Sequence, residues 1–248
     1  MAMEYVVYLS DSKIDMLYDQ INRADAETET EGEIKLGFFT IKRSRKRDNK
    51  LNRFEKLERV TTALMNRIGS PFDERIPSYV SDTLSMTWRS LEHTKQATYW
   101  IGEGGNNGIY TKLLLIGSTK NVIGEDPEGS DSATHSSLMH FLNAFRKEFE
   151  IPDNGYAATY ISLSQDKNGN TVKTLVDASE FDPSRMIDIL YNSTGSRRGF
   201  YDEYKFLAKV LTSEEHHDKY GRTERYIIAT PLYVSLAEKE KQSKEPIK

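Results

Sequence analysis

The chain has no cysteine among its 248 residues. It can therefore form no disulfide, present no thiolate nucleophile and bind no zinc through sulfur. It also lacks any apolar run of the roughly 18 to 20 residues needed to cross a bilayer, so we expect no membrane partner. The first ten residues have neither a basic region nor a small-residue cleavage site and do not resemble a signal peptide. We expect a soluble cytoplasmic protein.

Neither sign of charge dominates. The 34 lysines and arginines are set against 38 aspartates and glutamates, which gives a formal net charge of −4. Such a balance provides no overall attraction to nucleic acid or to anionic lipid. The length suits one large domain or two small ones. We expect a single domain over residues 1–237 and a flexible tail over 238–248.

The apolar residues follow strand spacing in some segments and helix spacing in others. Strands are expected at 5–9, 34–41, 79–88, 96–101, 109–116, 157–163, 171–176 and 226–229, with a glycine-rich hairpin loop at 102–108. Helices are expected to begin near Asp11, Phe54, Leu138, Asp182 and Phe200. Because strands occur both in hairpins and singly between helices, we predict an α+β fold: a twisted mixed sheet with roughly four to five helices.

Two phrases of the sequence echo each other. The pair Gly117-Ser118 follows one apolar run, and the pair Ala229-Thr230 follows another. A small residue and then a hydroxyl residue are typical of a buried strand that leaves a sheet and turns. The small residue allows close approach, and the hydroxyl can bond the freed N–H groups. These strand ends are the closest approach to a site in the sequence.

We predict that an anionic, nucleotide-like ligand binds at these strand ends, in a non-catalytic binding or regulatory module. Successive backbone N–H groups in a turn can hold a phosphate or a carboxylate. The predicted ligand contacts are Ser10, Asp11, Gly117, Ser118, Asn121 and Thr230. Ordinary structural turns explain the same residues, and the sequence leaves both interpretations open. No cofactor and no metal is predicted.

The strongest local charge is a basic tract at residues 42–53. Its arginines Arg43, Arg45 and Arg47 could contact the phosphates of a nucleic acid or a nucleotide, in an interaction that salt would weaken. No aromatic residue lies between these arginines, and an acidic segment at 24–33 is close in sequence. A solvated loop is therefore the alternative.

No reaction signature is present, so the sequence leaves open whether the protein is an enzyme. Asp11 and Asp15, one helical turn apart, could hold Mg²⁺ together with Asp82 in a metal-assisted phosphoester hydrolase. The structural alternative is that Asp11 caps the helix and Asp15 lies at its positive end. There is no His-Glu-x-x-His and no Gly-x-Ser-x-Gly. A protein-interaction component that docks through the charged residues 25–53 is a further alternative.

Four phrases distributed along the chain carry a family resemblance. They are Tyr8-Leu-Ser-Asp-Ser-Lys-Ile-Asp-Met-Leu17, Leu115-Ile-Gly-Ser-Thr-Lys-Asn-Val-Ile-Gly124, Phe206-Leu-Ala-Lys-Val-Leu211 and Thr230-Pro-Leu-Tyr-Val-Ser-Leu236. Together they resemble an uncharacterised bacterial domain-of-unknown-function family over nearly the whole chain. The resemblance implies one full-length unit, and it carries no established activity.

Overall fold

The computed structural model describes most of the chain, in two compact units. The described residues are 5–30, 51–91, 97–106, 108–124, 138–148, 153–154, 157–165, 171–178, 183–193, 201–217 and 222–237. One unit is Ser10–Arg67, and the other combines Met1–Leu9 with Ile68–Lys248. Each unit is described by itself, and the single domain over residues 1–237 stays a prediction. The expected strand at 34–41 lies outside the described residues.

The smaller unit contains two helices, α1 (Asp11–Thr30) and α2 (Arg53–Leu64), and the single 3₁₀ turn η1 (Met65–Arg67). Both α-helices were expected from the spacing of their apolar residues. Asn52 caps α2, because its side-chain oxygen accepts the backbone N–H groups of Phe54 and Glu55, each at 3.0 Å. The Glu55 carboxylate accepts the Asn52 N–H at 2.8 Å in return, which completes a capping box.

A polar contact joins the two helices. Lys56 of α2 donates to Asp15 of α1, with 2.6 Å between Nζ and Oδ1. The same ammonium lies 5.7 Å from the centre of the Tyr18 ring on α1, and the Arg59 guanidinium lies 6.0 Å from it. Two cations from α2 therefore face one aromatic ring of α1.

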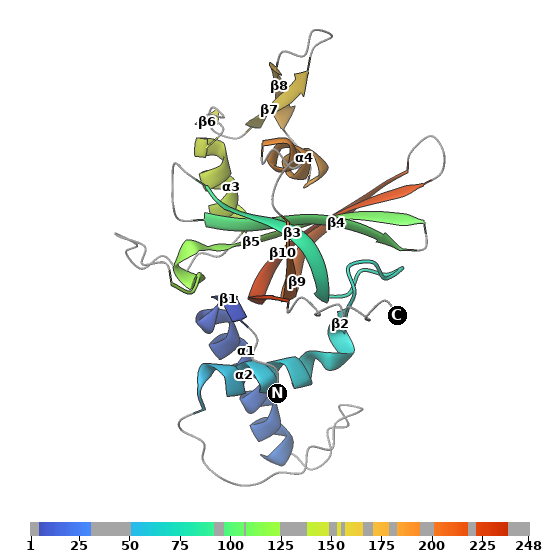
Figure 1. Cartoon of the computed structure of the whole chain (residues 1–248). Helices are drawn as coiled ribbons and strands as arrows, with labels where there is room; N and C mark the ends of the chain where they lie inside the picture. Colours follow the sequence, from blue (N-terminus) through green and yellow to red (C-terminus); the bar gives the residue numbers. More distant parts are fainter. Residues whose placement is uncertain are drawn as a thin grey trace, which may run out of the picture. The chain divides into compact units, whose positions relative to one another are not determined.

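Five strands of the larger unit close into a barrel (Figure 1). They are β3 (Tyr79–Ser90), β4 (Ala97–Asn106), β5 (Ile109–Ser118), β9 (Asp202–His217) and β10 (Thr223–Leu236). The pairs β3–β4, β4–β5, β3–β9 and β9–β10 are antiparallel, and the parallel pair β5–β10 closes the ring. The short strands β1 (Tyr5–Leu9) and β2 (Ile68–Gly69) pair with β10 and β3.

A five-stranded barrel is also the architecture of the oligonucleotide/oligosaccharide-binding (OB) fold. Here α3 (Leu138–Glu148) and α4 (Pro183–Ser193) both fall between β5 and β9. A separate small sheet of β6 (Asp153–Asn154), β7 (Ala157–Gln165) and β8 (Thr171–Ala178) also falls there. The architecture alone assigns no function.

The predicted α+β class, a twisted mixed sheet with four to five helices, is wrong. Strands make up 50% of the structure, and the main sheet closes on itself. The segment from Phe200 to Leu211, expected to be a helix, contains most of the described strand β9 instead. Phe206, Leu207 and Ala208 are consecutive and all buried, so the alternation that marks a strand is hidden. The pairing of β9 with β3 and β10 therefore determines that this segment is a strand.

Two apolar clusters hold the larger unit together. The first fills the barrel and includes Trp100, Leu113, Leu115, Phe206 and Ile227, with Tyr8 packed edge-on against Trp100 at 5.3 Å between ring centres. The second lies on the outer face, where α3 and α4 cover the apolar side of β4, β5 and β10 (Figure 1). Its members include Tyr99, Ile101, Leu114, Ile116, Ile228, Phe141, Phe145, Met186, Ile187 and Leu190.

The glycine-rich stretch at 102–108 is mostly strand rather than loop. Strand β4 continues to Asn106, and the turn involves Gly108, whose φ is +81°. A Cβ on Gly102 would lie 2.8 Å from the carbonyl oxygen of Ser85. On Gly104 it would lie 2.7 Å from Cζ of Phe72. These glycines therefore permit close packing, which composition alone does not distinguish from a loop.

Arg225 fixes the segment 70–77 to the barrel. Its side chain is 1% exposed. The guanidinium donates to the carbonyl oxygens of Pro71 at 3.3 Å, Asp73 at 2.5 Å and Glu74 at 2.9 Å. Its Nε donates to Glu215 at 2.7 Å. One buried cation thus satisfies three carbonyl groups of an otherwise irregular segment.

Replacing this guanidinium should destabilise the protein. We expect Arg225→Met to lower the free energy of unfolding by about 3 kcal/mol, because buried carbonyl groups lose their donors. Urea denaturation followed by circular dichroism measures the change. Arg89→Met, at an exposed arginine of β3, is the matched control and should cost less than about 0.5 kcal/mol. Equal losses in the two variants would contradict this role for Arg225.

Candidate functional site

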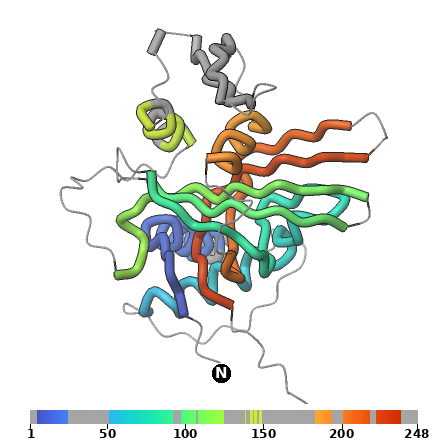
Figure 2. Tube along the Cα trace, turned by 45° about the horizontal axis from the view of Figure 1, so that its top comes forward, coloured from blue at the N-terminus to red at the C-terminus, as the bar shows by residue number. Residues whose placement is uncertain are grey.

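The outer face of the barrel changes from apolar to polar beyond the two covering helices. Strand register arranges this face in rows across β4, β5 and β10. The row Ile101, Leu114 and Ile228 is buried, the next is Glu103, Lys112 and Tyr226, and the last is Gly105, Tyr110 and Glu224. The two outer rows, with Arg222 before β10 and Tyr191 on α4, are called the polar face below. In Figure 2 the hairpins that carry these rows run side by side.

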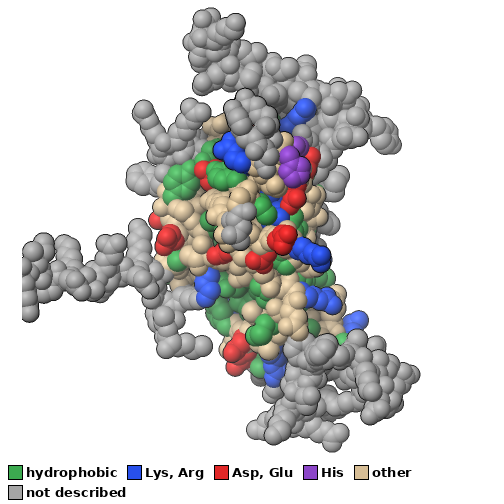
Figure 3. All heavy atoms as spheres, turned by 90° about the vertical axis from the view of Figure 1, so that its right-hand side faces the viewer, with side chains coloured by type: hydrophobic (Ala, Val, Ile, Leu, Met, Phe, Trp, Pro, Cys, Tyr) green, Lys and Arg blue, Asp and Glu red, His purple; other side chains and the backbone are tan. Residues whose placement is uncertain are grey.

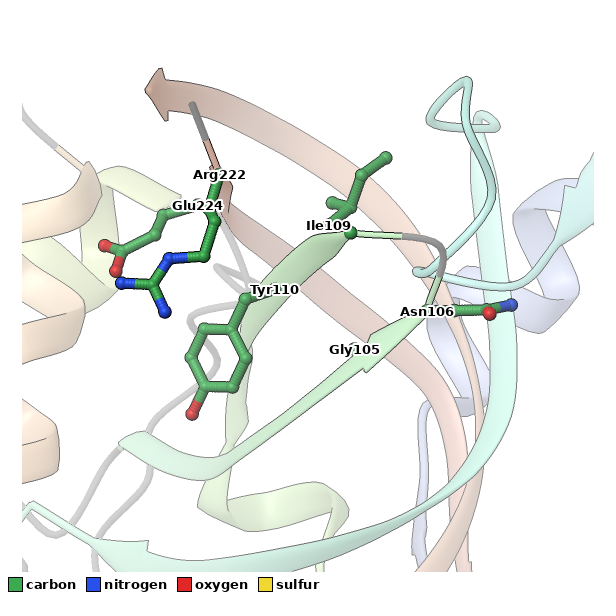
Figure 4. Close-up of a pocket in the computed structure, with 7 residues that line it drawn as sticks. Gly105, Asn106, Ile109, Tyr110, Arg222 and Glu224 are labelled. Carbon is green, nitrogen blue, oxygen red and sulfur yellow. The ribbon is translucent and has the colours of Figure 1, made fainter. Parts of the chain in front are cut away.

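A hollow of ≈ 490 Å³ lies at the end of the polar face (Figure 4). It is lined by Gly105, Asn106, Gly108, Ile109, Tyr110, Arg222 and Glu224. The side chains of Tyr110, Arg222 and Glu224 project to one side of the sheet, whereas Ile109 and Asn106 point away from them. Gly105 is the cross-strand partner of Tyr110, and its missing side chain leaves that flank of the ring open.

A carboxylate shared by two tyrosines organises the polar face. Glu103 of β4 is hydrogen-bonded to the hydroxyls of Tyr110 on β5 and Tyr191 on α4. Tyr191 is also hydrogen-bonded to Tyr201, just before β9. Burial and the bond to Glu103 raise the pKa of Tyr110 and of Tyr191 well above the ordinary value of 10.0. Both hydroxyls therefore remain protonated donors at neutral pH.

A second set of contacts holds α4 and β10 in place. Lys112 Nζ lies 2.7 Å from Asp188 Oδ1 on α4 and 5.1 Å from the centre of the Tyr226 ring. The Tyr226 hydroxyl donates to Glu224 Oε2 at 3.0 Å. Glu224 is thereby positioned at the hollow by a buried tyrosine, so it does not have to be ordered when a ligand arrives.

The polar face is acidic. Among the described residues, four carboxylates, those of Glu103, Asp188, Glu214 and Glu224, lie on or beside it, against the two cations Lys112 and Arg222. His216 pairs with Glu214 at 3.0 Å, and Figure 3, which looks from the side toward which the hairpins project, shows histidine beside acidic side chains. Among the described side chains in that view, basic groups form no continuous patch. A polyanion meets no complementary surface here.

The residues predicted from the sequence to bind an anion are divided between the two units. Ser10 and Asp11 begin the smaller unit, Ser10 buried and Asp11 exposed as the first residue of α1. Gly117, Ser118 and Thr230, like Asn121, belong to the larger unit. Arg43, Arg45 and Arg47 lie outside the described residues. A common anion site built from these residues stays a prediction.

Within the larger unit, Gly117 and Asn121 both contact Tyr8. A Cβ on Gly117 would lie 2.7 Å from the Tyr8 hydroxyl oxygen, and Asn121 Nδ2 donates to that oxygen at 3.1 Å. Ser118 ends β5 and precedes the short 3₁₀ helix η2 (Thr119–Asn121), without capping it through its side chain. Packing around Tyr8 is thus sufficient to explain a glycine at position 117.

Thr230 lies inside β10 rather than at a strand end. The register shifts after Ile228 and again between Pro231 and Tyr233. Residues 223–229 pair with β5, and residues from 233 onward pair with β1. The small-plus-hydroxyl pair at 229–230 therefore marks a bend, where one strand passes from one neighbour to another, and the proline removes a ladder donor at the same place.

The carboxylates considered for a hydrolase have structural partners. Asp15 is paired with Lys56 in the smaller unit, and Asp82 of β3 accepts the Ser70 hydroxyl at 2.6 Å in the larger one. Within the part of the chain that the structure describes, no group of three metal-ligating side chains is present.

Comparison with known proteins adds one finding. Residues 4–238 match the model of a family of unknown function, DUF7019. The chain belongs to that family. This confirms the resemblance carried by the four sequence phrases, over nearly the full length. No curated protein and no solved structure matches this DUF7019 chain. None of the helices described for it is long and apolar enough to cross a membrane.

Sequence reasoning missed the polar face. Its residues come from three separate segments, since Glu103 and Tyr110 lie on one hairpin, Tyr191 on α4 and Glu224 on β10, and no local motif joins the three. One signal was present: Tyr110 and Lys112, like Glu224 and Tyr226, stand two apart at the start of a strand, which places each pair on one face. Polar residues on the outward face of a predicted strand indicate that this face is not fully covered.

The packing around Gly117 can be tested in this DUF7019 chain. We expect Gly117→Ala to cost about 1–3 kcal/mol in unfolding free energy, because the new methyl group forces the Tyr8 ring from its place beside Trp100. Thermal and urea denaturation measure the loss. Ser118→Ala, at the next position, should change stability by less than about 0.5 kcal/mol. Unchanged stability of the alanine variant at 117 would contradict this packing.

The shared carboxylate predicts a pH dependence. Tyr110 and Tyr191 should stay protonated at pH values where an ordinary tyrosine, with a pKa of about 10, has largely ionised. Because both pKa values are raised by folding, this contribution to stability is complete below about pH 10 and is lost as the pH rises further. Titration of ¹³Cζ-labelled tyrosine by NMR, assigned with Tyr110→Phe and Tyr191→Phe, measures both values. Glu103→Gln should lower both, and two unmoved titrations would exclude the shared bond.

Proposed function

We propose that this protein is a non-catalytic binding module whose ligand binds at the polar face of the barrel. The observation that carries the proposal is the hollow beside Tyr110, where Arg222 and Glu224 project to the same side of the sheet. Binding sites typically combine aromatic surface with a few fixed polar groups. Here the tyrosine hydroxyl is held by Glu103 and the carboxylate of Glu224 by Tyr226.

The fold supports this location. OB folds bind their ligands across the second and third strands of the barrel, which here are β4 and β5. α3 and α4 cover the apolar part of that face. Their side chains Phe141, Phe145, Ile187 and Leu190 belong to the same buried cluster as the strand residues Tyr99, Ile101, Leu114 and Ile116. Among the described residues, the polar end of this face is the part that the two helices leave uncovered. The ligand is therefore short, or binds through a short segment, since an extended chain along both strands would meet the two helices.

A binding role agrees with the chemistry of the polar face better than a catalytic one. Its tyrosines have raised pKa values, so almost no phenolate is present at neutral pH to act as a base or a nucleophile. Its carboxylates are engaged by tyrosine hydroxyls. The groups are thus arranged to hold hydrogen bonds.

The anionic ligand predicted from the sequence is supported less well than this surface. Both carboxylates nearest the hollow, Glu103 and Glu224, would repel a phosphate, and Lys112 is already paired with Asp188. The proposal therefore retains the binding module and places its ligand on the outer face of the barrel.

Binding to a panel of small probes tests the proposal. Four kinds of probe would be titrated separately into the ¹⁵N-labelled full chain, each up to millimolar concentration. They are ATP, an oligothymidylate, a set of neutral trisaccharides and choline. We expect one class to shift the amides of Tyr110, Arg222 and Glu224 selectively. Tyr110→Ala should weaken that binding about tenfold, which corresponds to roughly 1.4 kcal/mol.

The control is another exposed tyrosine of the same unit. Tyr5 on β1 is 68% exposed, so Tyr5→Ala removes a similar ring without touching the polar face and should leave the affinity unchanged. Equal effects of the two substitutions, or no binding by any probe, would refute a ligand site at the polar face.

A further inference from the structure

We propose that the end of β9 pairs with the same strand of a second copy of this chain, in a two-fold symmetric dimer. The observation that carries the inference is a strand edge without a neighbour. β3 pairs with β9 as far as Lys209, whereas β10 pairs with it as far as His217. Within the described chain, residues 212–217 therefore have a neighbouring strand on one side alone. These residues are called the free edge below.

The free edge lies at the outside of the projecting hairpins. Figure 2 shows the hairpin of β9 and β10 beside the hairpin of β4 and β5, with β9 on the outside. Ser213, Glu215, His216 and His217 are exposed. Such an edge presents backbone N–H and C=O groups to which another strand can bond. A strand added there continues the order β4, β5, β10 and β9.

The alternation of side chains along β9 limits the registers that a symmetric pair can adopt. Glu214 and His216 lie on the polar face, because their partners on β10 belong to it. Glu215 lies on the opposite face, where its carboxylate accepts from Arg225 Nε at 2.7 Å. Residues directly opposite each other in an antiparallel pair share a face. A two-fold axis that keeps both polar faces on one side therefore passes through a residue of β9 and not between two residues.

The side chains of the free edge are self-complementary about Glu215. An axis at this residue places Glu214 of each copy opposite His216 of the other, which gives two pairs of a carboxylate and an imidazole. An axis at Glu214 or at His216 instead sets identical side chains of the polar face opposite each other. Glu215 meets its own copy, but in each chain Arg225 already binds it. Because like charges directly opposite destabilise a strand pair, the edge favours one register.

Glu214 also has an acceptor without a donor. Its Oε1 lies 3.0 Å from Nε2 of His216 in the same chain, whereas its Oε2 is buried and accepts no hydrogen bond. A buried acceptor without a donor costs free energy. In the proposed dimer the imidazole of the second copy lies opposite Glu214, and a turn of the carboxyl group presents Oε2 to that ring.

The dimer is expected to be weak and to enlarge the polar face. Two short strands bury far less than the roughly 1,600 Å² of a typical stable interface. The row that contains Tyr110, Glu224 and His216 in one copy continues into Glu214 of the other. The two hollows then lie on the same side of one sheet, so a molecule with two binding groups could occupy both and gain affinity from their linkage.

Sedimentation velocity of the full chain, from about 10 μM to about 1 mM, tests the dimer. We expect a monomer–dimer equilibrium. His216→Glu places a second carboxylate opposite Glu214 in both pairs and should weaken the dimer at least about tenfold. The double variant Glu214→His with His216→Glu exchanges the two members of each pair and should restore it. Lys209→Glu is the control, because Lys209 is an exposed residue of β9 that pairs on both sides.

The register is tested by cross-linking. The chain contains no cysteine, so an introduced thiol is unique. Glu215→Cys places two thiols directly opposite each other at the proposed axis, within reach of a disulfide. Oxidised glutathione should therefore link this variant into a covalent dimer faster than Ser213→Cys, whose thiol lies opposite His217 of the second copy. Circular dichroism confirms that each variant is folded.

Several results would overturn the inference. A chain that stays monomeric over the whole range has no such edge contact, and association that continues beyond the dimer contradicts the two-fold axis. A double variant that does not recover, or equal losses from His216→Glu and Lys209→Glu, would place the contact elsewhere. Faster linking through Ser213→Cys than through Glu215→Cys would refute the register.

Discussion

The parallel pairing of β5 with β10 is the constraint on which the rest of the larger unit depends. Seven consecutive pairs, from Thr223 with Ile109 to Ala229 with Leu115, join strands that are more than a hundred residues apart and close the barrel. Closure leaves these strands without a free edge along the paired residues. It also gives every strand an inner and an outer face, and thereby separates the cluster around Trp100 and Phe206 from the cluster beneath α3 and α4.

The same pairing creates the polar face. β5 alone carries Tyr110 and Lys112, and β10 alone carries Glu224 and Tyr226, but the register sets them side by side with Glu103 of β4. On the opposite face of β10, Arg225 points inward and binds the segment 70–77. Alternate residues of this strand therefore contribute to the polar face outside and to the packing inside. A site of this kind is rigid, because each functional side chain is fixed by a neighbour from another strand or helix.

Local patterns along the chain predicted several elements correctly. Asp11 and the apolar spacing after it predict α1, Leu138 to Phe145 predict α3, and Asp182-Pro183 predict the start of α4. They failed where tertiary contacts override local preference. Phe206-Leu207-Ala208 is buried on both faces, so its strand conformation left no alternation to detect. Gly102 and Gly104 resembled a loop, although neighbouring atoms of Ser85 and Phe72 require the absence of a side chain there.

Composition and local patterns were enough to establish the absence of thiol chemistry, the near balance of charge, most strands and helices, and a resemblance that the family match confirms. Those properties depend on composition or on neighbours within a few residues. The closure of the sheet into a barrel, and the surface shared by Glu103, Tyr110, Tyr191 and Glu224, became apparent only in the folded chain. Such contacts depend on strand register between distant segments, and one sequence contains no local pattern that specifies which residue lies opposite which.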